Sequence, residues 1–428
     1  MVSYDNWKLY RFYPCNKDDL SLVLTVQEGN FDVVFLQDHN QHLMNMAEHL
    51  FPVDMVISPR FEESDQFQYL INNLHPILTV DNLQALIDVE AESISEKGST
   101  YCWNKYGTHE LVLEIGSSYG NRPIKTLKMK SLEKSLGSIW LNGGTHGRDW
   151  ISSAVVTFAI EDLLNSKDES LINVIKLFDL YITPVLNPDG YNYSQQTDRL
   201  WKKNRAPTDS PIKCVGVDLN RNWDYRFECN RIFDTANADP CNDAYPGVKG
   251  FSEKETKAAQ KFYSSPEFEA QSKMFISVHG YNQLIMFPFG NPEDNLKEPE
   301  KTAWMDVANK AGLSMAGSSQ SDVEISCLPE TKFQVGSIKD VVGERRGSGI
   351  DWIKQEIPGV SLALEIGLYN IPEGFIVPPN QIEQKGIEFM RGFRELALYF
   401  QKNVGASQSD KMQCDYDESF ETAYCPAA

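Results

Sequence analysis

"GSIWLNGGTHGRDWISSAVVTFAIEDLLN" (residues 137–165) contains a strand, a turn and a helix in one run. Its first letters are apolar and strand-like, the paired glycines mark a turn, and the letters from Trp150 onward have the apolar spacing of a helix. His146 and Asp149 lie between strand and helix, at a spacing that brings two side chains to one side of a helix start. A single H-x-x-D step is more often a surface polar pair than a metal site. Other parts of the chain must therefore decide its role.

Strand-like and helix-like runs alternate along most of the chain. Apolar strand patterns recur at 177–191, 273–290 and 360–367, and a long helical pattern covers 381–403. Such alternation predicts an α/β fold in which a mixed, mostly parallel sheet is buried between helices.

The N-terminal part of the chain has a different organisation. Residues 4–90 read as a small α+β unit, and the polar stretch 91–100 reads as a linker with a trypsin-type cleavage residue at Lys97. We therefore expect the large domain to span 101–403. A polar, acidic tail that carries Cys414 and Cys425 is expected at 404–428.

Composition excludes several classes of protein. The chain has 428 residues, 41% of them hydrophobic, and a formal net charge of −20. That apolar content favours a well-packed globular protein, and the negative charge disfavours nucleic acid and anionic membranes as partners. The sequence contains no apolar run of about 18 residues, so no membrane span is expected. No secretory signal is visible at the N-terminus.

Two further polar side chains follow or interrupt apolar strands. His279 ends the strand "KMFISV", and Glu365 lies inside "VSLALEIG". Taken singly, His279 could be a hydrogen-bonded core histidine and Glu365 half of a buried ion pair. Together with His146 and Asp149 they favour a catalytic zinc site, because two histidines and one carboxylate leave a coordination position open. The second carboxylate would then act as the base.

The order of these motifs resembles the zinc metallocarboxypeptidases of the pancreatic A/B type. The resemblance covers nearly the whole chain, and residues 4–90 resemble the inhibitory pro-segment of that family. It rests on "GGTHGRDWIS", "NPDGY" (187–191), "CVGVDLNRNW" (214–223), "GVKGFSEKET", "SVHGYNQLIMFPFG" and "GSGIDW" (347–352).

The resemblance implies a role for each matching residue. One zinc ion per chain would be bound by His146, Asp149 and His279, with Glu365 as general base and acid. A family arginine that stabilises the developing oxyanion falls at Lys202. The residues implied for binding the peptide C-terminus are Asn220, Arg221, Arg148, Tyr281 and Ile350.

These substrate residues have distinct implied tasks. Asn220 and Arg221 would bind the terminal carboxylate, a task suited to a guanidinium fork. Arg148 would line the subsites and Tyr281 would border the cleft. Ile350 would form the floor of the pocket for the terminal side chain, where an apolar residue resembles the A type. The alternative for Ile350 is an ordinary core position.

Several positions depart from the family pattern. Asp149 replaces a glutamate that is one methylene longer, and Lys202 keeps the charge of the arginine but loses its planar fork. Gly280 replaces a serine, and Gly343 falls where the family has a mobile tyrosine. A stretch of helix at the front of the large domain is also missing. These departures together predict a slow or inactive enzyme that keeps its zinc.

Cysteine placement and one sequon favour an oxidising compartment. Cys214 and Cys241 match a family disulfide, and "NYS" at Asn192 is a glycosylation acceptor sequence. The sequence alone does not decide the pairing of Cys15, Cys102, Cys229 and Cys327. We therefore expect a secreted, monomeric proenzyme that a trypsin-like protease activates and that acts on C-termini of peptides and proteins.

Two alternatives to this enzyme stay open. The fold could bind peptide C-termini through Asn220 and Arg221 without cleaving them. The chain could also be a truncated or misassembled gene product.

Overall fold

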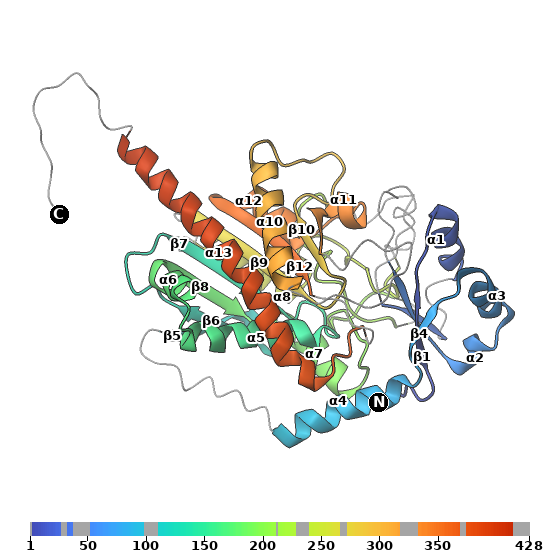
Figure 1. Cartoon of the computed structure of the whole chain (residues 1–428). Coiled ribbons are helices and arrows are strands. Elements are labelled where there is room, and N and C mark those ends of the chain that lie inside the picture. The colour runs from blue at the N-terminus through green and yellow to red at the C-terminus, as the bar shows by residue number, and fades with distance from the viewer. Residues whose placement is uncertain are drawn as a thin grey trace, which may run out of the picture.

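The computed structural model describes residues 2–26, 32–36, 52–97, 110–210, 213–227, 239–265, 272–316, 333–368 and 374–413. Cys102, Cys229, Cys327, Cys414 and Cys425 lie outside these ranges. The described part forms a small N-terminal unit beside a large α/β domain (Figure 1).

The N-terminal unit (residues 2–97) is an antiparallel sheet with helices, which confirms the α+β expectation. Its strands are ordered β2-β3-β1-β4. The sheet buries an apolar cluster that includes Phe12, Met55 and Phe67. The elements are β1 (Lys8–Phe12), α1 (Lys17–Val23), β2 (Val33–Phe35), β3 (Val53–Ile57), α2 (Pro59–Glu62), α3 (Asp65–Leu74), β4 (Ile77–Val80) and α4 (Leu83–Lys97).

The large domain (residues 110–413) is built on an eight-stranded sheet of order β11-β10-β12-β9-β7-β8-β6-β5. The central strands β12, β9, β7 and β8 run parallel, whereas β10 pairs antiparallel with β12 and β6 pairs antiparallel with β8. The strands are β5 (Glu110–Ser117), β6 (Pro123–Met129), β7 (Gly137–Asn142), β8 (Phe178–Thr183), β9 (Ser272–His279), β10 (Leu284–Phe287), β11 (Gln334–Ser337) and β12 (Val360–Gly367). A mixed, mostly parallel sheet is thereby confirmed.

Helices cover the sheet on both faces. Trp140 of β7 packs against Phe262 and Tyr263 of α8, while its neighbours in the strand point to the opposite face, and all six residues of β7 are buried. Helix α13 packs against α5, α6 and α10 and runs across the domain (Figure 1). The helices are α5 (Trp150–Asn165), α6 (Glu169–Leu177), α7 (Pro188–Gln196), α8 (Lys254–Tyr263), α10 (Glu300–Ala316), α11 (Ile338–Val342), α12 (Gly349–Glu356), the 3₁₀ turn η3 (Pro379–Gln381) and α13 (Ile382–Gln413).

Two helices continue past the expected boundaries of the N-terminal unit and of the large domain. Helix α4 continues through Lys97, so the first seven residues of the expected linker are helical, and α13 continues through Gln413, ten residues into the expected tail. Both stretches are polar but contain residues with adequate helix propensity. Polarity alone therefore did not indicate that these residues are helical.

The strands β9 and β10 follow each other closely in sequence but are not partners in the sheet. Strand β12 lies between them, parallel to β9 and antiparallel to β10. This insertion brings Glu365 of β12 level with the end of β9. Among the described residues, no helix is long and apolar enough to cross a membrane.

Candidate metal centre

The ends of two parallel strands bring the expected metal ligands together. His146 and Asp149 follow β7, His279 is the last residue of β9, and β7 and β9 are neighbours in register Asn142 to Ser277. Carboxyl ends of parallel strands meet at one edge of a sheet, where ligands of α/β proteins bind. Asp149 and His279 are buried there, and the side chain of His146 is 11% exposed.

Glycine shapes the turn that carries His146. Gly144 has a φ of +59°, and a Cβ there would lie 2.7 Å from the Ser153 Oγ atom. The turn therefore needs both the left-handed backbone and the missing side chain of glycine.

The carboxylate of Asp149 is not used to cap the helix that follows it. Asp149 is the N-cap residue of α5, a position where aspartate commonly bonds the helix N–H groups, but its side chain makes no such bond. Its Oδ2 accepts from the Gly280 N–H at 3.0 Å, and its buried Oδ1 has no hydrogen-bond partner among the residues that the structure describes. A buried acceptor without a partner is costly unless a cation completes it.

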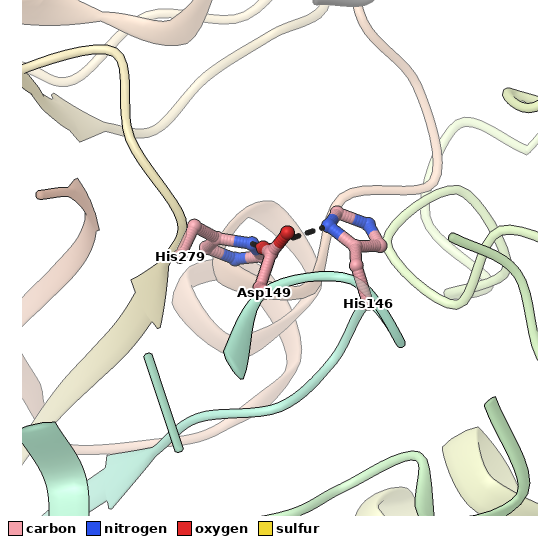
Figure 2. Close-up of side chains that lie close together, drawn as sticks. All are labelled: His146, Asp149 and His279. Atoms are coloured by element: carbon pink, nitrogen blue, oxygen red, sulfur yellow. Dashed lines mark ion pairs between the residues drawn. The ribbon is translucent and has the colours of Figure 1, made fainter. Parts of the chain in front are cut away.

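The carboxylate of Asp149 lies close to the distance from each histidine that a shared zinc ion requires. Asp149 Oδ2 lies 3.4 Å from His146 Nδ1 and 3.7 Å from His279 Nδ1, and all three ligand atoms lie within 4.8 Å of one another. Ligands at about 2.0–2.1 Å from a tetrahedral zinc are separated by about 3.3–3.4 Å. Figure 2 shows the Asp149 carboxylate between the two imidazole rings. Despite its shorter side chain, Asp149 is within reach of the metal.

Each histidine is oriented by a second residue. His146 Nε2 lies 3.0 Å from Asp218 Oδ1, and His279 Nε2 lies 3.0 Å from Ser277 Oγ. These contacts leave both Nδ1 atoms directed at Asp149. Partners on the far nitrogen fix the ring and its tautomer in metal sites.

Electrostatics favour a cation at this position. Burial lowers the pKa of His146, but the carboxylates of Asp218 and Asp149 outweigh it and raise that pKa to about 9. Burial raises the pKa of Asp149, but its hydrogen bonds and attraction to His146 and His279 hold it well below the usual value. The centre therefore stabilises positive charge on its ligands, as it would on a bound metal ion.

Glu365 lies beside the ligand set. Its Oε1 is 4.0 Å from His279 Nε2, and its side chain is 6% exposed. Burial raises its pKa, but Arg345 and His279 lower it to about 2. Lys202, in contrast, forms an ion pair with Asp218, with 2.9 Å between its Nζ and Oδ2.

Comparison with known proteins shows the family to which this chain belongs. A family model described as zinc carboxypeptidase matches residues 103–392. Zinc carboxypeptidase A 1 of Anopheles gambiae is 28% identical over 414 residues, which are 91% of this chain and 88% of that protein. Carboxypeptidase A2 of Rattus norvegicus is 31% identical over 349 residues, which are 74% of this chain and 77% of that protein. The chain belongs to the zinc carboxypeptidase family.

A solved structure supports the fold assignment. The crystal structure of thrombin activatable fibrinolysis inhibitor (TAFI) matches 94% of this chain and 100% of that chain, with a TM-score of 0.76 and 23% sequence identity. Because it belongs to the zinc carboxypeptidase family, this chain is a metallocarboxypeptidase, a zinc-dependent exopeptidase, and His146, Asp149 and His279 are the residues that fit its zinc.

Three of the residues expected to bind substrate in this carboxypeptidase lie near the metal centre or in the apolar core. Asn220 donates from Nδ2 to Glu365 Oε2 at 3.0 Å, and Arg221 donates from Nη1 to the Asn220 carbonyl at 3.0 Å. Ile350 is 2% exposed and belongs to the main apolar core. The structure therefore brings Asn220 to the metal centre and buries Ile350, as both the pocket-floor role and the core alternative would require.

Arg148 and Tyr281 of this carboxypeptidase contact the N-terminal unit. Arg148 donates from Nη2 to the Leu36 carbonyl at 3.1 Å, and the Tyr281 hydroxyl donates to Asp54 Oδ2 at 2.7 Å. Both contacts join residues expected at the substrate site to a segment expected to inhibit it.

Three residues at this centre were missed in the sequence. Asp218 lies inside the matching motif "CVGVDLNRNW", and membership of that motif could have marked it as a site residue. Ser277 stands two residues before His279, and that spacing puts both on one face of a strand. Arg345 in "GERRGSG" gave no signal, because an arginine in a glycine-rich loop reads as solvent-exposed.

Gly280 makes room for the aspartate ligand, and this predicts the effect of a methyl group. A Cβ at Gly280 would lie 2.7 Å from Phe375 Cε1 and 3.0 Å from Asp149 Cγ. We expect Gly280→Ala to weaken zinc binding by about tenfold or more, as mutations beside metal ligands do. Competition with a fluorescent chelator measures the change.

The matched control is a second tightly packed glycine. A Cβ at Gly312 in α10 would lie 2.9 Å from Phe333 Cβ. Gly312→Ala should leave zinc affinity unchanged. Equal affinities of wild type and Gly280→Ala would mean that Asp149 does not depend on Gly280.

Proposed function

We propose that this carboxypeptidase removes apolar residues from peptide C-termini, with Glu365 as general base and acid. The observation that carries the proposal is the position of Glu365, whose Oε1 lies 4.0 Å from a nitrogen of the zinc ligand His279. Zinc, when bound, polarises a carbonyl as a Lewis acid and lowers the pKa of water.

The protein's own groups would supply proton transfer and substrate binding. Glu365 would take a proton from the attacking water and give it to the leaving amine. Asn220 and Arg221 would bind the terminal carboxylate, and Lys202 would place positive charge near the reacting carbonyl. An apolar residue at Ile350, without a carboxylate at that position, supports a preference for apolar over basic C-terminal residues.

We further propose that residues 4–90 act as an inhibitory pro-segment. This rests on the contacts of Asp54 and the Leu36 carbonyl with Tyr281 and Arg148. Asp54 is itself fixed, because Arg11 donates to its two oxygens at 2.7 and 2.8 Å. A peptide would compete for donors that the N-terminal unit already occupies.

We also propose that the protein is secreted, on the basis of its disulfide and its glycosylation sequon. The Cys214–Cys241 disulfide is present, with Cα atoms 5.0 Å apart, and disulfides persist in oxidising compartments. Asn192 of the sequon lies in helix α7 and is half-buried, so the disulfide is the stronger support.

A noncatalytic protein that binds C-termini is the second candidate. The ion pairs of the two expected catalytic residues favour this candidate, because they engage the groups that catalysis needs. Glu365 is paired with Arg345, and Lys202 is paired with Asp218. Loss of one oxyanion donor typically costs about a hundredfold to a thousandfold in rate. A bound but uncleaved peptide would be the result of such losses.

One experiment separates these functions. The full chain is assayed with a blocked dipeptide ending in phenylalanine, and with one ending in lysine, before and after limited trypsin digestion. We expect the first cut near the end of α4, around Lys97, then a rise in hydrolysis and a preference for phenylalanine.

Other outcomes have distinct meanings. A cut protein that binds the phenylalanine peptide without cleaving it favours the binding protein. Activity that does not change after the cut contradicts inhibition by the N-terminal unit. A preference for lysine contradicts the role assigned to Ile350.

A further inference from the structure

Glu365 is already held as if it were a bound carboxylate ligand. Arg345 donates from Nη1 to Oε1 at 3.0 Å and from Nη2 to Oε2 at 2.5 Å, and Asn220 Nδ2 donates to Oε2 at 3.0 Å. The Arg345 and Glu365 side chains are 9% and 6% exposed. A guanidinium fork and an amide thus converge on one buried carboxylate, the arrangement that proteins use for carboxylate recognition.

The backbone fixes both donors. The Arg345 N–H donates to the Gly290 carbonyl at 3.0 Å, and a Cβ at Gly290 would lie 2.3 Å from the Arg345 carbonyl oxygen. Asn220 Oδ1 accepts from the Gly349 N–H at 3.1 Å, which directs Nδ2 at Glu365. The donors are therefore arranged in advance, whichever carboxylate they hold.

These contacts conflict with two roles in the proposed function. Asn220 is needed for the terminal carboxylate of the substrate, yet its amide donates to Glu365. Glu365 is needed as a base, yet both its oxygens accept from Arg345. Both roles can be met if one carboxylate replaces the other.

We propose that Asn220 and Arg345 form a carboxylate site that Glu365 fills in the substrate-free chain and that the substrate's terminal carboxylate takes on binding. Glu365 is then released toward the scissile bond. The inference rests on the proposed function and adds a specificity-determining residue, Arg345. A peptide with a C-terminal amide lacks the charge to displace Glu365, so it leaves the base held.

An empty carboxylate site can be made and probed without measuring activity. Glu365→Ala in the full chain removes the internal occupant and leaves the two donors. We expect acetate to raise the melting temperature of this variant by several degrees, by mass action, and acetamide or chloride at equal ionic strength to have no such effect. Wild type should not respond to acetate, because Glu365 fills the site.

The matched control removes the fork as well. In Glu365→Ala with Arg345→Met the acetate response should disappear. An equal response in that double variant would place the acetate elsewhere, at the metal for instance, and would overturn the proposal. A Glu365→Ala protein that does not respond to acetate would overturn it too.

A second measurement applies if Glu365→Ala does not fold. Calorimetry compares N-acetylphenylalanine with its amide on wild type and on Arg345→Lys, which keeps the charge but loses the fork. Wild type should prefer the acid by about tenfold or more, since hydrogen bonds to charged groups are worth that much, and the variant should lose most of this preference.

The inference is overturned if Arg345→Lys prefers the acid over the amide as strongly as wild type does. It is also overturned if neither protein prefers the acid. The proposed function fails separately, through absent hydrolysis by trypsin-cut wild type, whatever acetate does to the Glu365→Ala variant.

Discussion

Replacing Glu365 by glutamine should lower kcat by about a hundredfold to ten thousandfold, the range that general acid–base groups contribute. The substitution keeps the size of the side chain and its bond to Asn220 but removes the proton acceptor. We expect KM to change much less than kcat, because the base acts in the transition state. Steady-state hydrolysis of the phenylalanine dipeptide by the trypsin-cut protein measures both.

Glu344→Gln is the matched control for this experiment. Glu344 pairs with Arg346, with 2.7 Å between Oε1 and Nε, in the loop that also carries Arg345. The same chemical change there should leave kcat within about twofold, because it alters a pair that includes neither Glu365 nor a metal ligand. A Glu365→Gln enzyme with wild-type kcat would remove Glu365 from the mechanism.

The second large effect is expected on stability. Arg199 donates to both oxygens of Glu90 at 2.6 and 2.9 Å, and its side chain is 3% exposed. It also donates to the Arg148 and Phe375 carbonyls and lies 3.8 Å over the Trp150 ring. It thus joins α4 of the N-terminal unit to the large domain.

Arg199→Met should lower the free energy of unfolding by about 3–5 kcal/mol, because it leaves Glu90 buried without its partner. Arg226→Met is the control, since Arg226 pairs with Asp294 while 43% exposed, and it should cost less than about 1 kcal/mol. Denaturant titration of the full chain measures both. Similar losses in the two variants would contradict the difference in burial.

Much of the metal centre could be predicted from sequence, because its residues stand at the ends of apolar strands. His146 and Asp149 follow one strand and His279 ends another. Glu365 interrupts a third, and an acid in an apolar run was informative. The order of strands in the sheet was not predictable in this way. The placement of β12 between β9 and β10, which brings Glu365 to the histidines, depends on long-range pairing.

The contacts around the centre were harder to predict. Whether Arg345 points into solvent or toward Glu365 depends on loop geometry set by close backbone approaches, such as that of Gly290. The fit of Asp149 was also missed, since it depends on Gly280, which was counted as a separate departure. The shorter side chain of Asp149 and the missing side chain of Gly280 compensate for each other, and this is visible only in the three-dimensional structure.

The ends of α4 and α13 illustrate a different limit. Their polar extensions, 91–97 and 404–413, carry no apolar periodicity to distinguish helix from linker or tail. Hydrophobic patterning locates apolar helix faces well and polar helix turns poorly.

The zinc content of the purified full chain tests the central claim most directly. Atomic emission on wild type and on His279→Ala, each confirmed as folded by circular dichroism, compares the intact ligand set with one that lacks an imidazole. We predict about one zinc per chain in wild type and a large loss in the variant, because His279 supplies one of the three protein ligands of a catalytic site. Folded wild type without zinc, or a variant that retains as much as wild type, would contradict the assignment of His146, Asp149 and His279.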